Sequence, residues 1–500
     1  MTERLPKPSY KNENDSASLS ADLRSFIYLA GGLTHTMRYR ASGELEKPLE
    51  NYDLSGGDRS YIASAIMEYY FFIHREEFTA EDRDLALAIS LSYDLGDIAR
   101  QSRSENVIKT QNEQSDELQA TLHLIADLPD AHNFRDGLWT NFLVYKTAIH
   151  LPDSRLISDQ EKRISHLVRV AKGLGQLMYI ASKSPEVRRK IFAETGLTKE
   201  VLEIKYGRFM DNFPELKAWY RQLLKLLHKD MAHNSSSSIG SYKVHGDQSD
   251  KGSVLAGEPR NVQLAFDLVN FMSGKSGIQK HLQVLAHKEV AKTTIRNEVY
   301  QLLFLLRCKR VFMLSRHNKA LDEHRDSVAE HSFFMMVLAR YFLPLVQEDP
   351  RQKDSKKLST SDIFAQELVH DLGEIIRGDK TPDKKTEQDS HNEHDDMRML
   401  HRQFLPRKSG FHDFVLQTSE GYEKDKSSED LKVCPATFVK CLDIIEAFLY
   451  IIDPETSDKK NKMKLVDVDS FYEKNKKYFD LYPVLDDYFR EIILLFKLGN

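Results

Sequence analysis

The hexapeptide HDLGEI at residues 370–375 has a near copy, YDLGDI, at residues 93–98. Both share Asp, Leu, Gly, an acidic residue and Ile, but only the copy at 370–375 begins with His. Each follows apolar residues that are spaced as on one face of an α-helix. The pair suggests that the chain holds two copies of one helical domain, of which only the later copy carries residues for chemistry.

Other segments test this hypothesis, because a duplicated chain has to match elsewhere in the same order. Three further pairs of segments do so: 34–40 with 310–316, 167–180 with 438–451, and 212–227 with 481–496. From the hexapeptides onward, the offsets between equivalent positions are 277, 271 and 269 residues. Loop insertions between diverged repeats shift an offset by a few residues, so the ordered matches predict a tandem repeat.

The length and composition predict a globular chain with more than one hydrophobic core. A chain of 500 residues exceeds what one core usually supports, and 41% hydrophobic with 29% charged residues is an ordinary globular balance. Helical periodicity dominates and convincing strand alternation is absent, so we predict an all-α fold with two lobes. The predicted parts are a disordered tail at 1–20, a first helical domain at 21–232, a polar Ser/Gly-rich linker or loop at 233–256, and a second helical domain at 257–500.

Composition also argues against several functional classes. The formal charge of −5 gives no global basic field, and no basic stripe interleaves with aromatic residues, which disfavours long nucleic acid as a partner. The three cysteines lack paired metal-type spacing, which fits a reducing compartment. The N-terminal segment is polar, and no apolar run approaches the ~20 residues that span a bilayer. We therefore expect a cytoplasmic protein without a membrane partner.

Four residues in the second half have the chemistry of a metal site: His331, the doublet His370-Asp371, and Asp443. Each borders an apolar run in a segment with helical periodicity. A divalent metal needs neutral imidazole and ionised carboxylate groups that converge from different helices, which helix packing can supply. The bound cation would lower the pKa of a coordinated water and polarise a phosphoryl oxygen. From the residues alone, separate side chains satisfied by hydrogen bonds or solvent remain an equal alternative.

The order His, His-Asp, Asp resembles the HD-domain phosphohydrolase superfamily. The surrounding words DSVAEHS at 326–332, HDLGEIIRGDKTP at 370–382 and the stretch from EGYEKDK to CLDIIEA at 420–447 look like its 5′-deoxynucleotidase (YfbR-type) branch. The resemblance covers residues 300–500 in detail. It implies that the second domain is an HD phosphohydrolase domain and that the first is a degenerate HD-like domain.

The resemblance also implies a role for individual residues. The metal ligands would be His331, His370, Asp371 and Asp443. Glu374 matches the acid near the metal-bound water, Asp379 a further acid that helps the nucleophile or leaving group, and Arg316 the arginine that grips the substrate phosphate. The alternatives are a solvated helix end for the two acids and a surface position for the arginine. His317 departs from the tryptophan of the deoxynucleotidases, which leaves the sugar preference open.

Two other features have plainer explanations. The cluster HNEHDD at 391–396 has the residue types of a second metal site, but its polar surroundings favour a solvated loop or helix face. Lys384 and Lys385 could contact a phosphate, but exposed positions are favoured. Glu330 could orient a ligand, and an exposed charge explains it equally well.

The repeat alignment replaces nearly every ligand in the first half. His370 becomes Tyr93, Asp443 becomes Lys172, and the position of His331 falls near Ser64; only Asp371 keeps its chemistry, as Asp94. A lysine ammonium in place of a carboxylate opposes a metal cation by charge. We therefore predict a first lobe without a metal and with a structural role. Anion binding near Arg38 and Arg40 is a less favoured alternative.

These observations predict a metal-dependent phosphohydrolase, in particular a 5′-nucleotidase that releases phosphate from (deoxy)nucleoside monophosphates with Mn²⁺, Co²⁺ or Mg²⁺. The alternatives are an HD hydrolase of another phosphate substrate (a dNTP, cyclic nucleotide, alarmone or nucleic-acid end) and a non-catalytic nucleotide sensor or interaction protein. The expected partner is a small-molecule nucleotide, and a homodimer is an open alternative to a monomer.

Overall fold

The fold is all helical, as the hydrophobic periodicity predicts. A computed structural model describes residues 19–35, 54–93, 95, 111–126, 128, 133–231, 260–273, 294–309, 327–354, 358–377, 387–403, 405–453 and 467–498. Within these ranges the chain forms α-helices and short 3₁₀ helices, and no β-strand occurs. The predicted all-α class is therefore confirmed.

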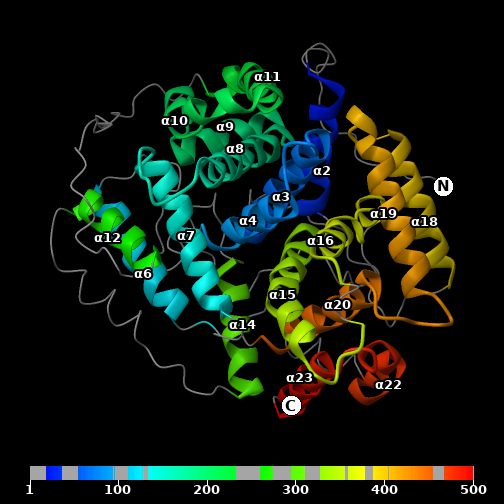
Figure 1. Ribbon diagram of the computed structural model, residues 1–500. Helices are drawn as coiled ribbons and strands as arrows, with labels where there is room; N and C mark the ends of the chain where they lie inside the picture. The colour runs from blue at the N-terminus through cyan, green and yellow to red at the C-terminus, as the bar shows by residue number, and fades with distance from the viewer. Residues whose placement is uncertain are drawn as a thin grey trace.

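For description, we divide the helices by their order along the chain, whose colour runs from blue to red in Figure 1. The helices up to α12 are called the first lobe, and those from α14 onward the second lobe. The first lobe contains α2 (Ala21–His35), α3 (Gly56–Ile73), α4 (Ala80–Ser92), α6 (Gln111–Ala126), α7 (Phe134–His150), α8 (Asp159–Ala181), α9 (Pro185–Thr195), α10 (Lys199–Lys205), η2 (Gly207–Asn212), α11 (Pro214–Met231) and α12 (Arg260–Ser273). The second lobe contains α14 (Ile295–Lys309), α15 (Val328–Glu348), α16 (Thr360–Val369), α17 (Glu374–Arg377), α18 (Glu387–Gln403), η5 (Lys408–Gly410), α19 (Phe411–Lys426), α20 (Pro435–Ile452), α22 (Val468–Phe479) and α23 (Pro483–Leu498).

Local sequence signals set where the central helices begin. In α3, the Ser55 side chain accepts a hydrogen bond from the Asp58 N–H, and the Asp58 carboxylate accepts one from the Ser55 N–H. In α15, Ser327 Oγ accepts from the Glu330 N–H at 3.0 Å. Such caps satisfy N–H groups that have no partner inside the helix. α20 instead begins with Pro435, whose missing N–H costs nothing at a first position.

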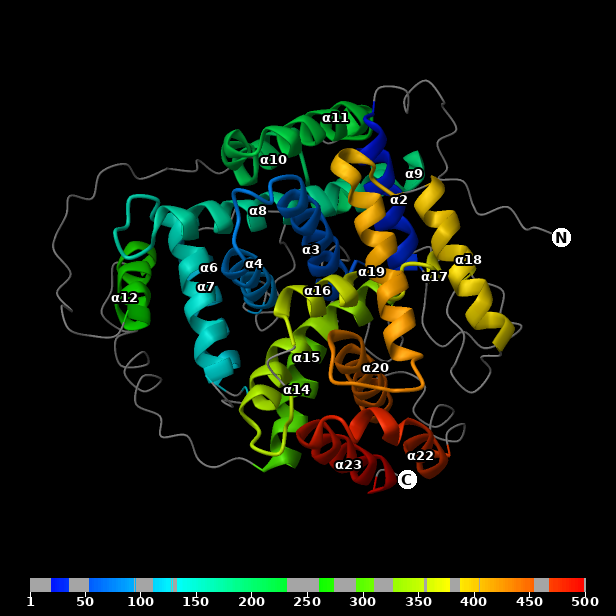
Figure 2. The same cartoon turned by 45° about the vertical axis from the view of Figure 1, so that its right-hand side comes forward.

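Helix α12 packs with the first lobe. It lies against α6 and α7, and Figure 2 shows it beside α7. The Arg260 guanidinium donates to the Glu161 carboxylate at 2.7 Å and to the Leu156 carbonyl at 2.8 Å. The boundary predicted at residue 257 would give this helix to the second domain, whereas its apolar face is buried on the first. The preceding segment 232–259, with the predicted linker, and residues 1–18 of the predicted tail lie outside the described residues.

The two lobes are joined by close packing of α3 on α15. Gly57 sits so near this contact that an added Cβ would lie 2.8 Å from Cγ of Glu330. Ser327 Oγ donates a hydrogen bond to the Asp58 carboxylate across the same junction. The hydroxyl of Tyr61, one turn further along α3, donates to the backbone carbonyl of Leu368 in α16 at 2.5 Å. The first lobe therefore contacts two helices of the second lobe directly.

No helix among the described residues is long and apolar enough to cross a bilayer. This finding agrees with the absence of long apolar runs in the sequence.

The contact at Gly57 generates a prediction about stability. Gly57→Val should destabilise the protein by about 1–3 kcal/mol, because the new side chain overpacks the junction against Glu330 and Phe334. Urea unfolding followed by circular dichroism measures the change. Gly137→Ala in α7 is the control, since a Cβ there meets nothing within 4 Å, and it should stabilise the protein by about 0.5–1 kcal/mol. Equal effects of the two substitutions would contradict the tight junction.

Candidate metal centre

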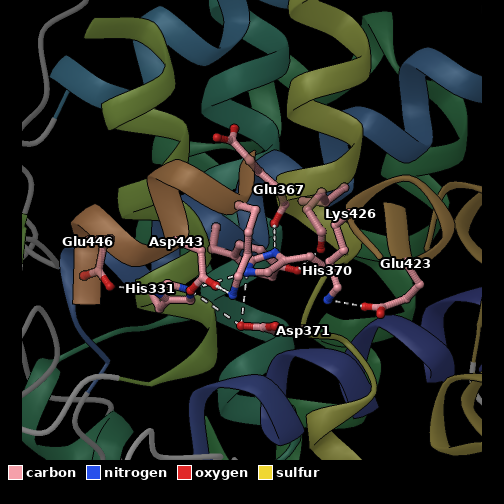
Figure 3. A network of polar contacts seen from close by, with 11 residues as sticks. His331, Glu367, His370, Asp371, Glu423, Lys426, Asp443 and Glu446 are labelled. Atoms are coloured by element: carbon pink, nitrogen blue, oxygen red, sulfur yellow. Dashed lines mark hydrogen bonds and ion pairs between the residues drawn. The ribbon is translucent and has the colours of Figure 1, made fainter. Parts of the chain in front are cut away.

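Three packed helices bring the four predicted ligands together. His331 lies in the first turn of α15, His370 and Asp371 follow the last turn of α16, and Asp443 lies in the middle of α20. Each of these helices packs against the other two. Figure 3 shows the four side chains pointing toward one another from these elements. The predicted convergence of a doublet with two single residues is thus present in the structure.

The distances within this cluster suit a shared cation. The Nε2 atom of His331 lies 3.5 Å from a carboxylate oxygen of Asp371, 3.5 Å from Oδ1 of Asp443 and 3.4 Å from Nε2 of His370. The Nε2 atom of His370 lies 3.1 Å from Asp371 Oδ2. Metal–ligand bonds of about 2.0–2.2 Å place neighbouring donor atoms about 3.0–3.5 Å apart. The observed separations fall in that range.

The hydrogen bonds on the far side of both rings fix their tautomers. His370 Nδ1 lies 2.9 Å from the backbone carbonyl of Glu367, which can only accept, so this nitrogen carries the proton. His331 Nδ1 lies 2.6 Å from the carboxylate of Glu446 and donates to it in the same way. Both neutral imidazoles therefore present the lone pair of Nε2 to the centre of the cluster. A carboxylate that orients a metal-binding histidine through its second nitrogen is a common feature of metal sites.

The two aspartates complete a set of four lone-pair donors. Burial alone would raise the pKa of Asp371, but the positive charge of His370, and then of His331, outweighs it when these rings are protonated and holds that pKa below its usual range. A divalent cation held by the neutral rings would act on the carboxylate in the same direction. Lys440 donates to Oδ2 of Asp443 at 2.7 Å, which leaves Oδ1 facing His331. With both rings in this tautomer, two imidazole nitrogens and a carboxylate oxygen of Asp371 lie close together, and Oδ1 of Asp443 lies beside Nε2 of His331. That donor chemistry fits a divalent cation of the Mn²⁺, Co²⁺ or Zn²⁺ kind.

The sequence did not single out the side chains that support this cluster. Glu446 is fully buried and lies one turn after Asp443 on α20, so helical spacing from the predicted ligand was the available signal. Tyr422 of α19 packs edge-on to the His370 ring with centroids 6.1 Å apart, and burial raises its pKa. Lys426, one turn later, lies over the Tyr422 ring at 4.5 Å. No local pattern indicates that α19 faces the site.

The remaining predicted site residues are placed differently. Glu374 is buried at 8% exposure, and its N–H donates to the Asp371 carbonyl at 3.0 Å, which puts it in the turn that follows the doublet. Arg316 and Asp379 lie outside the described residues, as do His317, Lys384 and Lys385.

The HNEHDD cluster forms part of α18, and its described His394 lies 4.0 Å from Glu420 of α19. The side chains of residues 391–393 lie outside those that the structure describes, and His394 lies on the side of α18 that meets α19. This placement agrees with a helix face as the explanation of the cluster.

Three side chains also come together near the first-lobe positions that the repeat alignment pairs with the ligands. Ser55 and Ser327 each cap a helix, and the fourth residue after each cap is Arg59 in α3 and His331 in α15. The predicted counterpart Ser64 lies more than one turn further along α3. Tyr93 ends α4 as His370 ends α16.

These first-lobe residues carry positive charge instead of ligands. The Lys172 ammonium lies 4.1 Å and the Arg59 guanidinium 5.9 Å from the centre of the Tyr93 ring. All three side chains are buried. Asp94, which keeps the ligand chemistry in the sequence, lies outside the described residues.

Comparison with known proteins agrees with the geometry of the second lobe. Residues 312–483, about a third of the 500-residue chain, match the HD domain family. The matched segment contains all four clustered side chains. It supports the predicted HD superfamily relationship and, in general terms, a metal-dependent phosphohydrolase. No curated protein sequence and no solved structure matches the chain.

Glu367 gives a prediction for the pH dependence of stability. Its carboxyl is fully buried with no hydrogen-bond partner among the described residues, and burial raises its pKa well above 4.5. A raised folded-state pKa gives stability that is present at low pH and is lost as the pH rises through that pKa. Glu367→Gln removes this loss while keeping the backbone carbonyl that His370 uses. The variant should therefore gain stability relative to the wild type between pH 5 and pH 8 in urea unfolding.

Glu348→Gln, at an exposed position near the end of α15, is the control for this comparison. It should show no such trend with pH. A Glu367→Gln difference that is independent of pH would contradict a neutral buried carboxyl.

Proposed function

We propose that the second lobe is a metal-dependent nucleotidase that releases phosphate from (deoxy)nucleoside 5′-monophosphates. The observation that carries this proposal is the convergence of the two Nε2 lone pairs with the Asp371 and Asp443 carboxylates. His331, His370, Asp371 and Asp443 would hold a divalent cation, which supplies Lewis-acid polarisation of a phosphoryl oxygen and of water. The nucleotide substrate itself rests on the resemblance of the words around these residues to the 5′-deoxynucleotidase branch.

The reaction requires positioned acids and cations around the ligands. A water oxygen attacks phosphorus, the P–O bond to the nucleoside breaks, and the nucleoside 5′-oxygen takes up a proton. Glu374, in the turn after Asp371, accepts the proton of the attacking water, and Asp379 assists the nucleophile or the leaving oxygen. Arg316 binds the phosphate through a planar pair of donors. These three assignments rest on the family resemblance.

Lys440 supports this proposal from the structure. Its ammonium holds Oδ2 of Asp443 at 2.7 Å and is about one quarter exposed, with 26% of the side chain accessible. It therefore lies at the edge of the cluster, where solvent and a phosphate can reach it. A cation at this place neutralises part of the negative charge that a phosphate would otherwise meet in the two aspartates.

We further infer that the first lobe is a degenerate copy of the second. The support is the shared order of elements: the capped helices α3 and α15, the helices α4 and α16 that end at Tyr93 and His370, and the long helices α8 and α20 with Lys172 and Asp443. Arg59, Tyr93 and Lys172 stand where the second lobe has its ligands. Two buried cationic groups in those places oppose metal binding by charge.

A phosphate-release panel tests the proposed activity. We expect purified wild-type protein to release phosphate from deoxynucleoside monophosphates with Mn²⁺, Co²⁺ or Mg²⁺, and Asp371→Ala to lose this release, because one of the four donors is gone. Nucleoside di- and triphosphates, cyclic nucleotides and alarmones form the other arms. Activity that survives in Asp371→Ala would reveal a contaminating phosphatase. Turnover of triphosphates alone would overturn the monophosphatase assignment but keep the metal site.

The bond between Glu446 and His331 predicts an effect on metal affinity. Glu446→Gln removes the negative charge behind Nδ1, so the Kd for Mn²⁺ measured by calorimetric titration should rise about 10–100-fold. Glu423→Gln is the matched control, since this carboxylate pairs with Lys426 and its side chain is 42% exposed. An unchanged Kd in Glu446→Gln would show that the carboxylate does not tune the ligand.

A further inference from the structure

A second His–Asp doublet lies away from the candidate metal centre. His412 and Asp413 occupy the first turn of α19, and His401 lies in the last turn of α18. The two helices pack together as a hairpin, which Figure 2 shows beside α17 and α2. Gly410, with φ of 79°, lets the chain enter α19 through a left-handed conformation that a side chain would oppose. The turn thus places the doublet opposite His401.

The donor atoms of this cluster are spaced as in the first one. His401 Nε2 lies 3.0 Å and His412 Nε2 3.4 Å from the same oxygen, Oδ1 of Asp413. The three donor atoms lie within 4.8 Å of one another. Bonds of about 2.0–2.2 Å to a common metal would separate such donors by about 3.0–3.5 Å. The two rings are stacked, with centroids 4.9 Å apart and 16° between their planes, so one ring has to turn for both lone pairs to reach one ion.

The surroundings suit a ligand-binding role. Both histidine side chains are 20% exposed and Asp413 is 56% exposed, so an ion and water can reach the cluster. Nδ1 of His412 is buried and has no hydrogen-bond partner among the described residues, which leaves Nε2 as the nitrogen through which this ring interacts. The carbonyl end of α18 beside His401 also favours a cation.

The nearby basic residues make contacts elsewhere. The Arg407 guanidinium donates to the Arg402 carbonyl at 2.6 Å, and the Arg407 N–H donates to Asp22 of α2 at 2.8 Å. Lys408 pairs with Glu215 of α11 at 3.3 Å. These contacts do not supply an ammonium or guanidinium partner to Asp413, which instead meets the two imidazoles of His401 and His412.

We propose that His401, His412 and Asp413 form a second metal site, for a divalent transition ion of the Zn²⁺ class. Two imidazole nitrogens and one carboxylate oxygen favour Zn²⁺, Co²⁺ or Ni²⁺ over Mg²⁺ and Ca²⁺, which prefer oxygen ligands. The open positions would be filled by water. An ion here ties the end of α18 to the start of α19.

A metal bound here would affect helices that lie next to the candidate metal centre. α18 packs against α17, whose first residue is Glu374, and α19 packs against α16, which ends at His370. A metal that fixes the α18–α19 hairpin therefore stabilises elements next to the candidate catalytic centre without being part of it. This inference does not depend on the proposed nucleotidase activity.

Metal stoichiometry in the full-length protein tests the site. Apo protein is titrated with Zn²⁺ against a chromophoric chelator, and Co²⁺ binding is followed by its visible absorption. We expect the wild type to bind two equivalents, His401→Ala/His412→Ala one, His370→Ala/Asp371→Ala one, and the combined variant none. Zn²⁺ should also raise the Tm of His370→Ala/Asp371→Ala, and this rise should vanish in the combined variant.

His394→Ala is the control, because His394 is a half-exposed histidine of α18 that lies 4.0 Å from Glu420 and outside the cluster. It should keep two equivalents. The second site is overturned if His401→Ala/His412→Ala binds as much metal as the wild type. If instead only His370→Ala/Asp371→Ala binds as much as the wild type, the second site stands and the metal centre of the proposed function falls. The two proposals can thus fail separately.

Discussion

The convergence of four lone-pair donors from three helices is the constraint on which the second lobe depends. The Nε2 atom of His331 has to lie within about 3.5 Å of His370, Asp371 and Asp443, which holds only while α15, α16 and α20 keep their packing. Hydrogen bonds from the Nδ1 atoms reinforce this arrangement: His331 Nδ1 donates to the Glu446 carboxylate, and His370 Nδ1 donates to the Glu367 carbonyl. The position of each ligand is therefore set by packing and by a second hydrogen bond.

The first lobe directly contacts two of the helices that carry the predicted ligands. Tyr61 donates to the carbonyl of Leu368, two residues before His370, and Asp58 accepts from Ser327, the cap of the helix that carries His331. Burial, followed by the charge of Asp371, raises the pKa of the Tyr61 hydroxyl, so it stays a donor. A lobe that carries Arg59 and Lys172 instead of ligands thus still braces two ligand helices. This supports the structural role that the sequence predicted for it.

Sequence reasoning was strongest where local pattern and residue chemistry coincide. Apolar periodicity predicted the helices, and the ordered doublet and single residues predicted the cluster, because metal chemistry restricts the residue types. Prediction from the sequence failed where contacts between residues far apart in the chain decide the structure. The placement of α12 on α6 and α7, and the approach of Tyr422 to His370, depend on which helix faces which. The helix caps place Arg59 of α3 and His331 of α15 at the same distance from the start of their helices, and apolar periodicity alone does not reveal this correspondence.

Charge balance explains why a divalent cation suits the candidate centre. Glu446, Asp371 and Asp443 contribute three negative charges at the histidines (Figure 3). The Lys440 ammonium on Asp443 offsets one of them. Protonating both imidazoles would also restore neutrality, but it would direct the Nε2 protons of His331 and His370 toward each other across 3.4 Å. A 2+ ion removes the same excess while using both lone pairs. In the first lobe, buried Arg59 and Lys172 instead bring positive charge to the ring of Tyr93, and such charge opposes a cation there.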